Sequence, residues 1–287
     1  MEMVSAAKLR RSQSVVESAR PYAGDLQAVL GNLARASGDV QHPAFLGREV
    51  KHRAIILVTS DRGLCGAFNG NLIRATEERI RALGRPTQLV LLGKKGADYF
   101  RRRSFPILAA RTDLGGIADY KFADEMSRSI TAKFEAGEID EVDLIYTRFK
   151  SALRRTLVVE SYLPIGRGAD ATSTPGAHGA AMAGAPAAAA GAISTPAAAA
   201  VSGDYLYEPD PGVILSRIVP YLLAMRLYMA LAESAASEHG ARMIAMGSAT
   251  KNANEMIQDL TLHMNRTRQA TITREIVEIV GGAEALK

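Results

Sequence analysis

The segment Leu57–Leu72, with the sequence LVTSDRGLCGAFNGNL, holds the residues best suited to chemistry in this chain. An apolar run ends in a polar turn with Gly63, Gly66 and Gly70, and an amphipathic stretch follows. A strand, a glycine-rich turn and a helix start in this order are typical of phosphate-binding loops. The turn also contains Cys65, the only cysteine. The segment could therefore be a nucleotide site, a nucleophilic cysteine or a structural corner.

The glycine spacing of this turn argues against a nucleotide site. A dinucleotide-binding turn needs G-x-G-x-x-G and a P-loop needs G-x-x-x-x-G-K-[ST], whereas Gly63 and Gly66 form only G-x-x-G. A nucleophilic Cys65 would need a histidine and a third orienting group. No recognisable cysteine-hydrolase pattern contains any of the five histidines, which are His42, His52, His178, His239 and His263. We predict that Cys65 is a small buried thiol, and that Asp61 and Arg62 form a turn ion pair or a capped strand exit.

The other motifs predict no catalytic residue, no metal site and no cofactor. Neither C-x-x-C nor H-E-x-x-H, two spacings that zinc sites use, occurs in the chain. Glu238 and His239 are adjacent, but no second histidine follows four residues later, so we expect them on a solvated helix face. We expect the glycosylation pattern at Asn265–Thr267 to be accidental.

The composition favours a protein built on long helices. Aromatic residues make up 6% of the chain, tryptophan is absent, and alanine, leucine, methionine and arginine are abundant. The net charge of +5 permits an acidic partner, but the basic residues are dispersed and give nucleic-acid binding no specific support. One cysteine excludes an internal disulfide, and no apolar run approaches the roughly 18–20 residues of a membrane span. Because the N-terminus has no hydrophobic signal core, we predict a soluble intracellular protein.

Residues 1–37 are predicted to form one helix of a coiled coil. Mostly apolar residues recur at spacings of three and four, which places them on one helical stripe. The stripe comprises Val4, Ala7, Arg11, Val15, Ala19, Tyr22, Leu26, Val29 and Leu33. Pro21 interrupts the stripe and should kink the helix. No capping residue precedes the pattern, so we expect the helix to be truncated at its start.

Residues 50–165 alternate between predicted strands and helices and should form a central α/β domain. Apolar, β-branched runs predict strands at Ala54–Ser60, Gln88–Gly93, Pro106–Ala110, Val142–Phe149 and Thr156–Leu163. Amphipathic stretches predict helices at Gly70–Leu83, Lys94–Arg103 and Tyr120–Ala136. This alternation is typical of a mostly parallel, Rossmann-like sheet, and the last two strands could form an antiparallel hairpin at its edge.

The last part of the chain contains a biased segment and a very long helix. Residues 166–203 are rich in alanine and proline and cannot bury enough apolar surface, so we predict a disordered loop. Residues 204–287 contain a predicted helix from Tyr221 to Val280 that would span roughly 90 Å. Its apolar stripe lapses near Arg268 and comprises Ala249, Ala253, Met256 or Ile257, Leu260, Met264, Ile272, Ile276 and Ile279. Such a helix must pack on another long helix or on other subunits.

These elements predict an α/β fold in which a long antiparallel coiled coil of the N- and C-terminal helices flanks a central, mostly parallel α/β domain. Periodicity and length alone lead to this topology. Two functional classes are compatible with this topology. A nucleotide-dependent α/β enzyme would bind ATP or NAD, whereas a free-standing coiled-coil scaffold would form a stable homodimer.

Several long motifs closely resemble the gamma subunit of F-type ATP synthase. In chain order they are MEMVSAAKLRRSQ, the segment Ala19–Ala23, TSDRGLCGAFNGNL, DYLYEPDP, SEHGARMIAMGSATKNANEMI and RQATITREIVEIVGGAEAL. The resemblance runs from residue 1 to the C-terminus and leaves out only the alanine- and proline-rich segment. It implies a rotor shaft that binds no catalytic nucleotide, with catalysis on the beta subunits.

The resemblance also implies partners and a location. The terminal helices would lie inside the ring of alternating alpha and beta subunits, and the α/β domain would sit below, against the epsilon subunit and the membrane c-ring. Proton flow would turn the ring and shaft, whose asymmetric faces drive the beta-subunit sites through different nucleotide affinities. The chain would be a peripheral membrane protein on the cytoplasmic face of the bacterial inner membrane, without a nucleic acid or a small-molecule substrate of its own.

Matched residue by residue, the resemblance assigns contacts with beta-subunit loops to six residues. These are Arg242, Arg268, Gln269, Thr273, Met1 and Lys8. Small residues between Ser234 and Ala249 would either give a low-friction surface or allow close helix packing, and the sequence leaves both open. Lys251 stands where the family often has an acid, so a polar contact is not carried over at this position.

Overall fold

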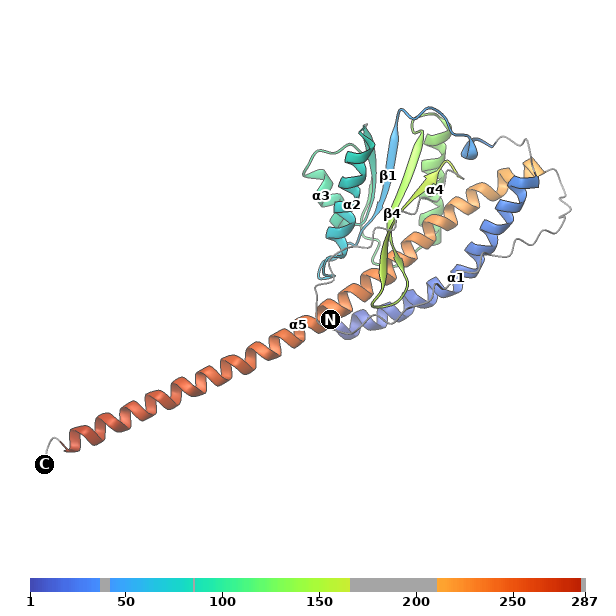
Figure 1. Ribbon diagram of the computed structural model, residues 1–287. Helices are drawn as coiled ribbons and strands as arrows, with labels where there is room; N and C mark the ends of the chain where they lie inside the picture. The colour runs from blue at the N-terminus through green and yellow to red at the C-terminus, as the bar shows by residue number, and fades with distance from the viewer. Residues whose placement is uncertain (37–41, 85, 166–210, 285–287) are drawn as a thin grey trace, which may run out of the picture.

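The computed structural model describes residues 1–36, 42–84, 86–165 and 211–284. The disordered loop predicted for residues 166–203 lies outside these ranges. The described residues form a sheet domain and two terminal helices that lie side by side (Figure 1).

The centre of the domain is a five-stranded sheet with the strand order β3-β2-β1-β4-β5. The strands are β1 (Arg53–Val58), β2 (Thr87–Leu92), β3 (Ile107–Arg111), β4 (Glu141–Phe149) and β5 (Arg155–Leu163). The first four strands are parallel, and β5 pairs antiparallel with β4 at the edge. The predicted, mostly parallel sheet with an edge hairpin is confirmed.

Helices cover both faces of this sheet (Figure 1). On one face, α2 (Phe68–Leu83) and α3 (Lys94–Arg101) enclose a core that includes Leu57, Leu72 and Phe100. On the other face, α4 (Tyr120–Glu135) and the first half of α5 (Pro211–Glu284) enclose a larger core. The short 3-10 turn η1 (Pro43–Phe45) leads into the sheet and packs against α4. Residues of α5 are thus part of the domain core.

The helix α1 (Glu2–Ala36) runs antiparallel to α5. Glu2 lies beside Gly247, whereas Leu30 packs in the cluster that contains Leu215 and Val219. The predicted antiparallel pairing of the terminal helices is therefore present. The helix α1 continues through Pro21 and bends along α5 (Figure 1).

The predicted apolar stripe of α1 has the wrong phase. Val4, Tyr22 and Val29 are 57%, 46% and 45% exposed, whereas Leu9, Val16 and Leu30 are buried. The buried residues are spaced by multiples of seven and therefore share one face of α1. This face is next to the predicted one, because Val16 and Leu30 each follow a residue of the predicted stripe. Two adjacent faces of α1 are apolar, and contact with α5 decides which of them is buried.

The helix α5 is longer than predicted, with 74 residues and a length of about 110 Å. It begins at Pro211, in place of the predicted Tyr221, and continues through Pro220. Its residues 248–283 are exposed and project from the domain (Figure 1). The segment Gly212–Ala283 contains an apolar 18-residue stretch with a mean hydropathy of 1.4, of which 44% is buried in the fold. The prediction that the chain has no apolar stretch of this length is therefore wrong. Core helices of soluble domains also contain such stretches, so this one is weak evidence for a membrane span.

A buried tyrosine fixes α5 against the sheet, and its hydroxyl gives a first prediction. The Tyr162 hydroxyl donates to the Leu223 carbonyl oxygen (2.8 Å) and pairs with the Ser127 hydroxyl (2.9 Å). The substitution Tyr162→Phe should lower the free energy of unfolding by about 1–2 kcal/mol, because both partners stay buried without this bond. Denaturant unfolding measures the change.

Tyr99→Phe is the matched control. The Tyr99 hydroxyl donates to Glu77 at 2.9 Å between two helices at the protein surface, where water can replace it. Its loss should cost clearly less, and equal losses for the two variants would contradict the anchoring role of Tyr162.

Candidate functional site

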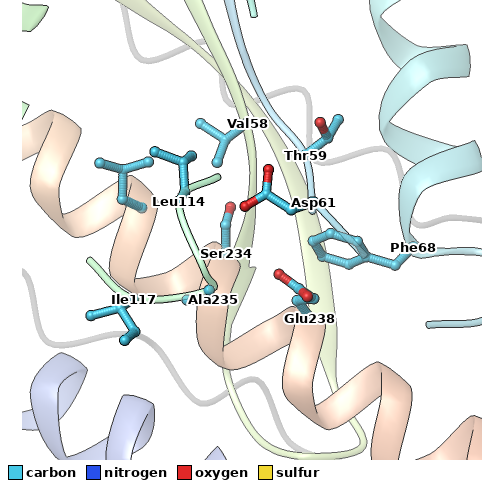
Figure 2. Close-up of a pocket in the computed structure, with 11 residues that line it drawn as sticks. Val58, Thr59, Asp61, Phe68, Leu114, Ile117, Ser234, Ala235 and Glu238 are labelled. Atoms are coloured by element: carbon cyan, nitrogen blue, oxygen red, sulfur yellow. The ribbon is translucent and has the colours of Figure 1, made fainter. Parts of the chain in front are cut away.

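The helix α5 occupies the place where an open α/β sheet usually binds its ligand. Such ligands bind beyond the carboxyl ends of the strands, where the strand order reverses, which here lies between β1 and β4. A cavity at this point has a volume of about 20 Å³, enough for about one water molecule. Its walls come from β1, the following turn, the loop after β3 and α5, and include Val58, Asp61, Leu114, Ser234 and Glu238 (Figure 2). The cavity is far too small for a nucleotide.

Asp61 takes the position that an anion would need at this edge. Its carboxylate accepts hydrogen bonds from the backbone N–H groups of Lys94 (3.0 Å), Asp113 (3.1 Å) and Gly115 (2.9 Å). Lys94 is the first residue of α3, where a phosphate would meet the positive end of the helix dipole. Of the two alternatives left open for Asp61, the capping role is observed. The glycine-rich turn is therefore a structural corner closed by its own carboxylate.

Cys65 and its neighbours complete this corner. The thiol is 2% exposed and accepts a hydrogen bond from the Asn69 side chain at 3.1 Å, which confirms the predicted buried thiol. Left-handed backbone falls on Leu64 (φ 63°) and Gly66 (φ 58°). Leu64 is 64% exposed, so its strained conformation holds an apolar side chain in solvent.

Arg242 joins this corner to α5. The guanidinium is buried, and its Nη2 lies 2.6 Å from a carboxylate oxygen of Glu238. It also donates to the carbonyl oxygens of Gly63 (3.2 Å) and Arg62 (3.3 Å). Arg242 is thus committed to contacts within the chain, and no contact with another subunit is needed to explain its burial.

His239 joins α5 to the loop after β3. This contact and the corner that Arg242 binds together form the junction between α5 and the sheet domain. Its Nε2 lies 3.3 Å from the Gly116 carbonyl oxygen, and its Nδ1 lies 3.3 Å from Arg242. Burial lowers the pKa of His239 to about 4, so the ring is neutral near pH 7. Burial also raises the pKa of Glu238, against the opposing effect of Arg242. The prediction that Glu238 and His239 lie on a solvated face is wrong, because loops distant in sequence cover both.

The small residues of α5 allow close packing. Ala235, Ala236 and Ala241 are buried, and the hydroxyl groups of Ser234 and Ser237 hydrogen-bond to the backbone of Thr147 in β4. For these residues, close packing is the alternative that the structure supports. Ser248 and Ala249, farther along α5, are exposed.

The other predicted contact residues lie at two places. Met1, which precedes α1, and Lys8 on α1 are exposed, and the positive charge of Lys8 lowers the pKa of both Glu238 and His239. Arg268, Gln269 and Thr273 are exposed on the projecting part of α5. This part also exposes ten large apolar side chains, namely Met256, Ile257, Leu260, Leu262, Met264, Ile272, Ile276, Val277, Ile279 and Val280. The structure does not bring the six residues into one cluster.

Comparison with known proteins finds one family along the whole chain. A family model described as ATP synthase matches residues 1–286. The chain is 46% identical to the ATP synthase gamma chain of Moorella thermoacetica and 43% identical to that of Heliobacterium modesticaldum, and it covers 92% of each. Both alignments include 100% of this chain.

Solved structures share the fold. A chain of the Tetrahymena thermophila mitochondrial ATP synthase central stalk and c-ring has a TM-score of 0.62 at 22% identity, with 87% of this chain and 97% of that chain covered. A chain of the Euglena gracilis mitochondrial ATP synthase has a TM-score of 0.56 at 17% identity, with 98% and 95% covered.

A pair of neighbouring glycines tests the junction. A Cβ on Gly116 would lie 2.9 Å from Nε2 of His239, whereas one on Gly115 would meet no atom within 4 Å. Both have positive φ, so alanine strains the backbone equally at either position. Gly116→Ala should cost about 1–3 kcal/mol more than Gly115→Ala in denaturant unfolding, because it displaces His239. Equal costs would show that the His239 contact does not hold the loop.

The buried histidine should make stability depend on pH. Since the pKa of His239 falls from 6.5 to about 4 on folding, the unfolded chain binds the extra proton, and stability is lost as pH falls from about 6.5 towards 4. The loss is on the order of 3 kcal/mol, partly offset by Glu238, which gains a proton more readily when folded. Urea unfolding at about pH 7 and pH 4.5 should show a smaller change for His239→Gln than for the wild type.

His263→Gln is the control for this measurement, because His263 is exposed on the projecting part of α5. Its unfolding should keep the wild-type pH dependence. An unchanged slope in His239→Gln would contradict the burial of a neutral imidazole at the junction.

Proposed function

The chain belongs to the ATP synthase gamma chain family, and from this premise we propose that it is the central rotor shaft of an F-type ATP synthase. In this role it couples proton-driven rotation of the membrane c-ring to conformational change at the catalytic beta subunits. ATP synthesis and the reverse hydrolysis take place on those subunits, and this chain is not catalytic.

The observation that carries the proposal is the projecting part of α5. Residues 248–283 are exposed along the whole segment, which is about 55 Å long. Ten large apolar side chains on one such rod exceed what a monomeric protein normally leaves in water. They are suited to a partner that surrounds the helix, and the ring of alpha and beta subunits is the partner that family membership suggests.

The sheet domain supports a mechanical role. Its ligand crevice is filled by α5 and Asp61, which favours a structural domain over a nucleotide-binding one. Because the domain lies to one side of α5, the rod and domain together have no rotational symmetry (Figure 1). As such a body turns, each beta subunit meets a different face and favours a different conformation.

The residues proposed to bind beta-subunit loops are those whose side chains are exposed. Arg268, Gln269 and Thr273 are free to bind beta-subunit loops, and Met1 and Lys8 can do so where α5 leaves the domain. A beta-subunit contact for Arg242 would compete with its internal hydrogen bonds. The sheet domain would meet the epsilon subunit and the c-ring, and the chain would then be a peripheral protein on the cytoplasmic face of the bacterial inner membrane.

Co-expression with alpha and beta subunits tests the proposal. The chain should co-purify with them as the single asymmetric subunit, and the complex should hydrolyse ATP. Arg268→Ala with Gln269→Ala should lower the ATPase rate of the complex severalfold, because both side chains lie on the exposed rod and can bind beta-subunit loops.

Arg266→Ala is the matched control. Arg266 is also exposed on α5 but lies on a different side of the helix from Arg268. The control should keep the wild-type rate. Alpha and beta subunits that form an equally active complex without this chain would contradict the rotor proposal.

A further inference from the structure

Five charged side chains of alternating sign connect both terminal helices to the β4–β5 hairpin. In spatial order this charge ladder consists of Arg20 of α1, Glu233 of α5, Arg148 of β4, Glu160 of β5 and Arg226 of α5. The successive N–O distances are 3.0, 3.8, 3.4 and 3.4 Å. The ladder joins three elements that are distant in sequence.

The central acid, Glu233, lies at the interface of the two helices. It is 5% exposed, and burial raises its pKa against the attraction of Arg20 and Arg148. The Oε2 atom of Glu233 has no hydrogen bond. Among the ion pairs of the described residues, it lies nearest to Nε of Arg148, at 3.8 Å. A buried ion pair adds less stability than apolar packing would, and a polar group at a helix interface is best known for fixing register.

The two ends of the ladder are tied to the backbone. Arg20 donates to the Phe149 carbonyl oxygen at 3.1 Å, at the end of β4. Arg226 donates to the carbonyl oxygens of Ser161 (2.7 Å) and Tyr162 (3.3 Å) in β5. Since Arg226 and Glu233 are seven residues apart, they lie on the same face of α5 and hold the hairpin between them.

Apolar packing alone would not hold these elements against a twisting load. The contacts between α1 and α5 here involve Val16, Ala232 and Ala236. Apolar burial resists separation, but it is non-directional and resists sliding or turning of a helix much less. Charge-assisted hydrogen bonds depend on direction and distance, so they resist such displacement.

We propose that the charge ladder transmits torque between the sheet domain and the coiled coil, with Arg148 and Glu160 as its positioning residues. The inference rests on the proposed rotor function. Arg148 is central because its guanidinium reaches Glu233 and Glu160 together and also donates to the Tyr146 hydroxyl at 3.0 Å. Without it, Glu233 and Arg20 lose their ionic connection to the hairpin, and only the Arg226–Glu160 pair still joins α5 to it.

The first test measures coupling in the complete ATP synthase reconstituted in vesicles. Arg148→Met keeps the aliphatic bulk and removes the charge, so proton pumping per ATP hydrolysed should fall severalfold while ATPase activity stays. Arg148→Lys restores one positive charge and should recover part of the pumping. Arg128→Met, which breaks the Arg128–Asp124 pair within α4, should leave the pumping ratio unchanged.

An unchanged pumping ratio in Arg148→Met would overturn the proposal. A parallel loss of pumping and ATPase activity would also overturn it, because the ladder would then support assembly of the active complex and not the transmission of torque. If complexes without this chain pump protons as well as complete ones, the rotor function itself fails.

The second test needs no partner and examines the ladder alone. Spin labels at Leu153, in the hairpin turn, and at Lys251, on α5, are placed in a Cys65→Ser background of the full chain, because both sites are exposed. The distance distribution should broaden in Arg148→Met and stay narrow in Arg128→Met. Identical distributions in wild type and Arg148→Met would overturn the ladder's positioning role, whatever the chain's function.

Discussion

The fold depends on one constraint, which is that a 74-residue helix cannot be buried along its whole length by a domain of this size. The first half of α5 solves this by packing simultaneously on α1, α4 and the sheet. Alanine and serine allow that close approach between residues 234 and 241. The second half has no partner within the described residues and remains exposed. The buried half thus belongs to the sheet domain, and the exposed half is the part that is available to a partner.

Filling the ligand crevice is one consequence of this constraint. The path of α5 takes it past the carboxyl ends of β1 and β4, and the loops there close on Glu238, His239 and Arg242. A carboxylate from the chain itself satisfies the backbone N–H groups that could bind an anion. A domain with the topology of nucleotide-binding domains therefore holds a helix where a ligand would bind. Apolar burial stabilises the contact between α5 and the domain, and directional polar contacts fix the position of α5.

Local features of the fold could be predicted from the sequence. The five strands and the helices α1 to α4 agree with their predicted ranges to within a few residues, because each has a clear apolar period and clear end signals. The start of α5 was missed because Pro220 suggests a break, yet surrounding packing holds the helix through it. The stripe of α1 was misplaced because two adjacent faces are apolar and only the partner helix selects one.

Long-range contacts could not be predicted in the same way. Glu238 and His239 have an exposed pattern in sequence and are buried by loops more than a hundred residues away. The spacing of Glu238 and Arg242, four residues apart on a helix, was the available signal for their ion pair. The charge ladder draws on three parts of the chain that are distant in sequence, so no local pattern indicates it. The long motifs, in contrast, were sufficient to indicate the family.

A rotor shaft must turn inside the ring of alpha and beta subunits, and direct observation of rotation tests this role best. A probe attached through Arg81→Cys, an exposed site on α2, would report the motion of the sheet domain while the alpha and beta subunits are fixed to a surface. The probe should turn continuously in one direction during ATP hydrolysis. Hydrolysis at the normal rate with a stationary probe would contradict it.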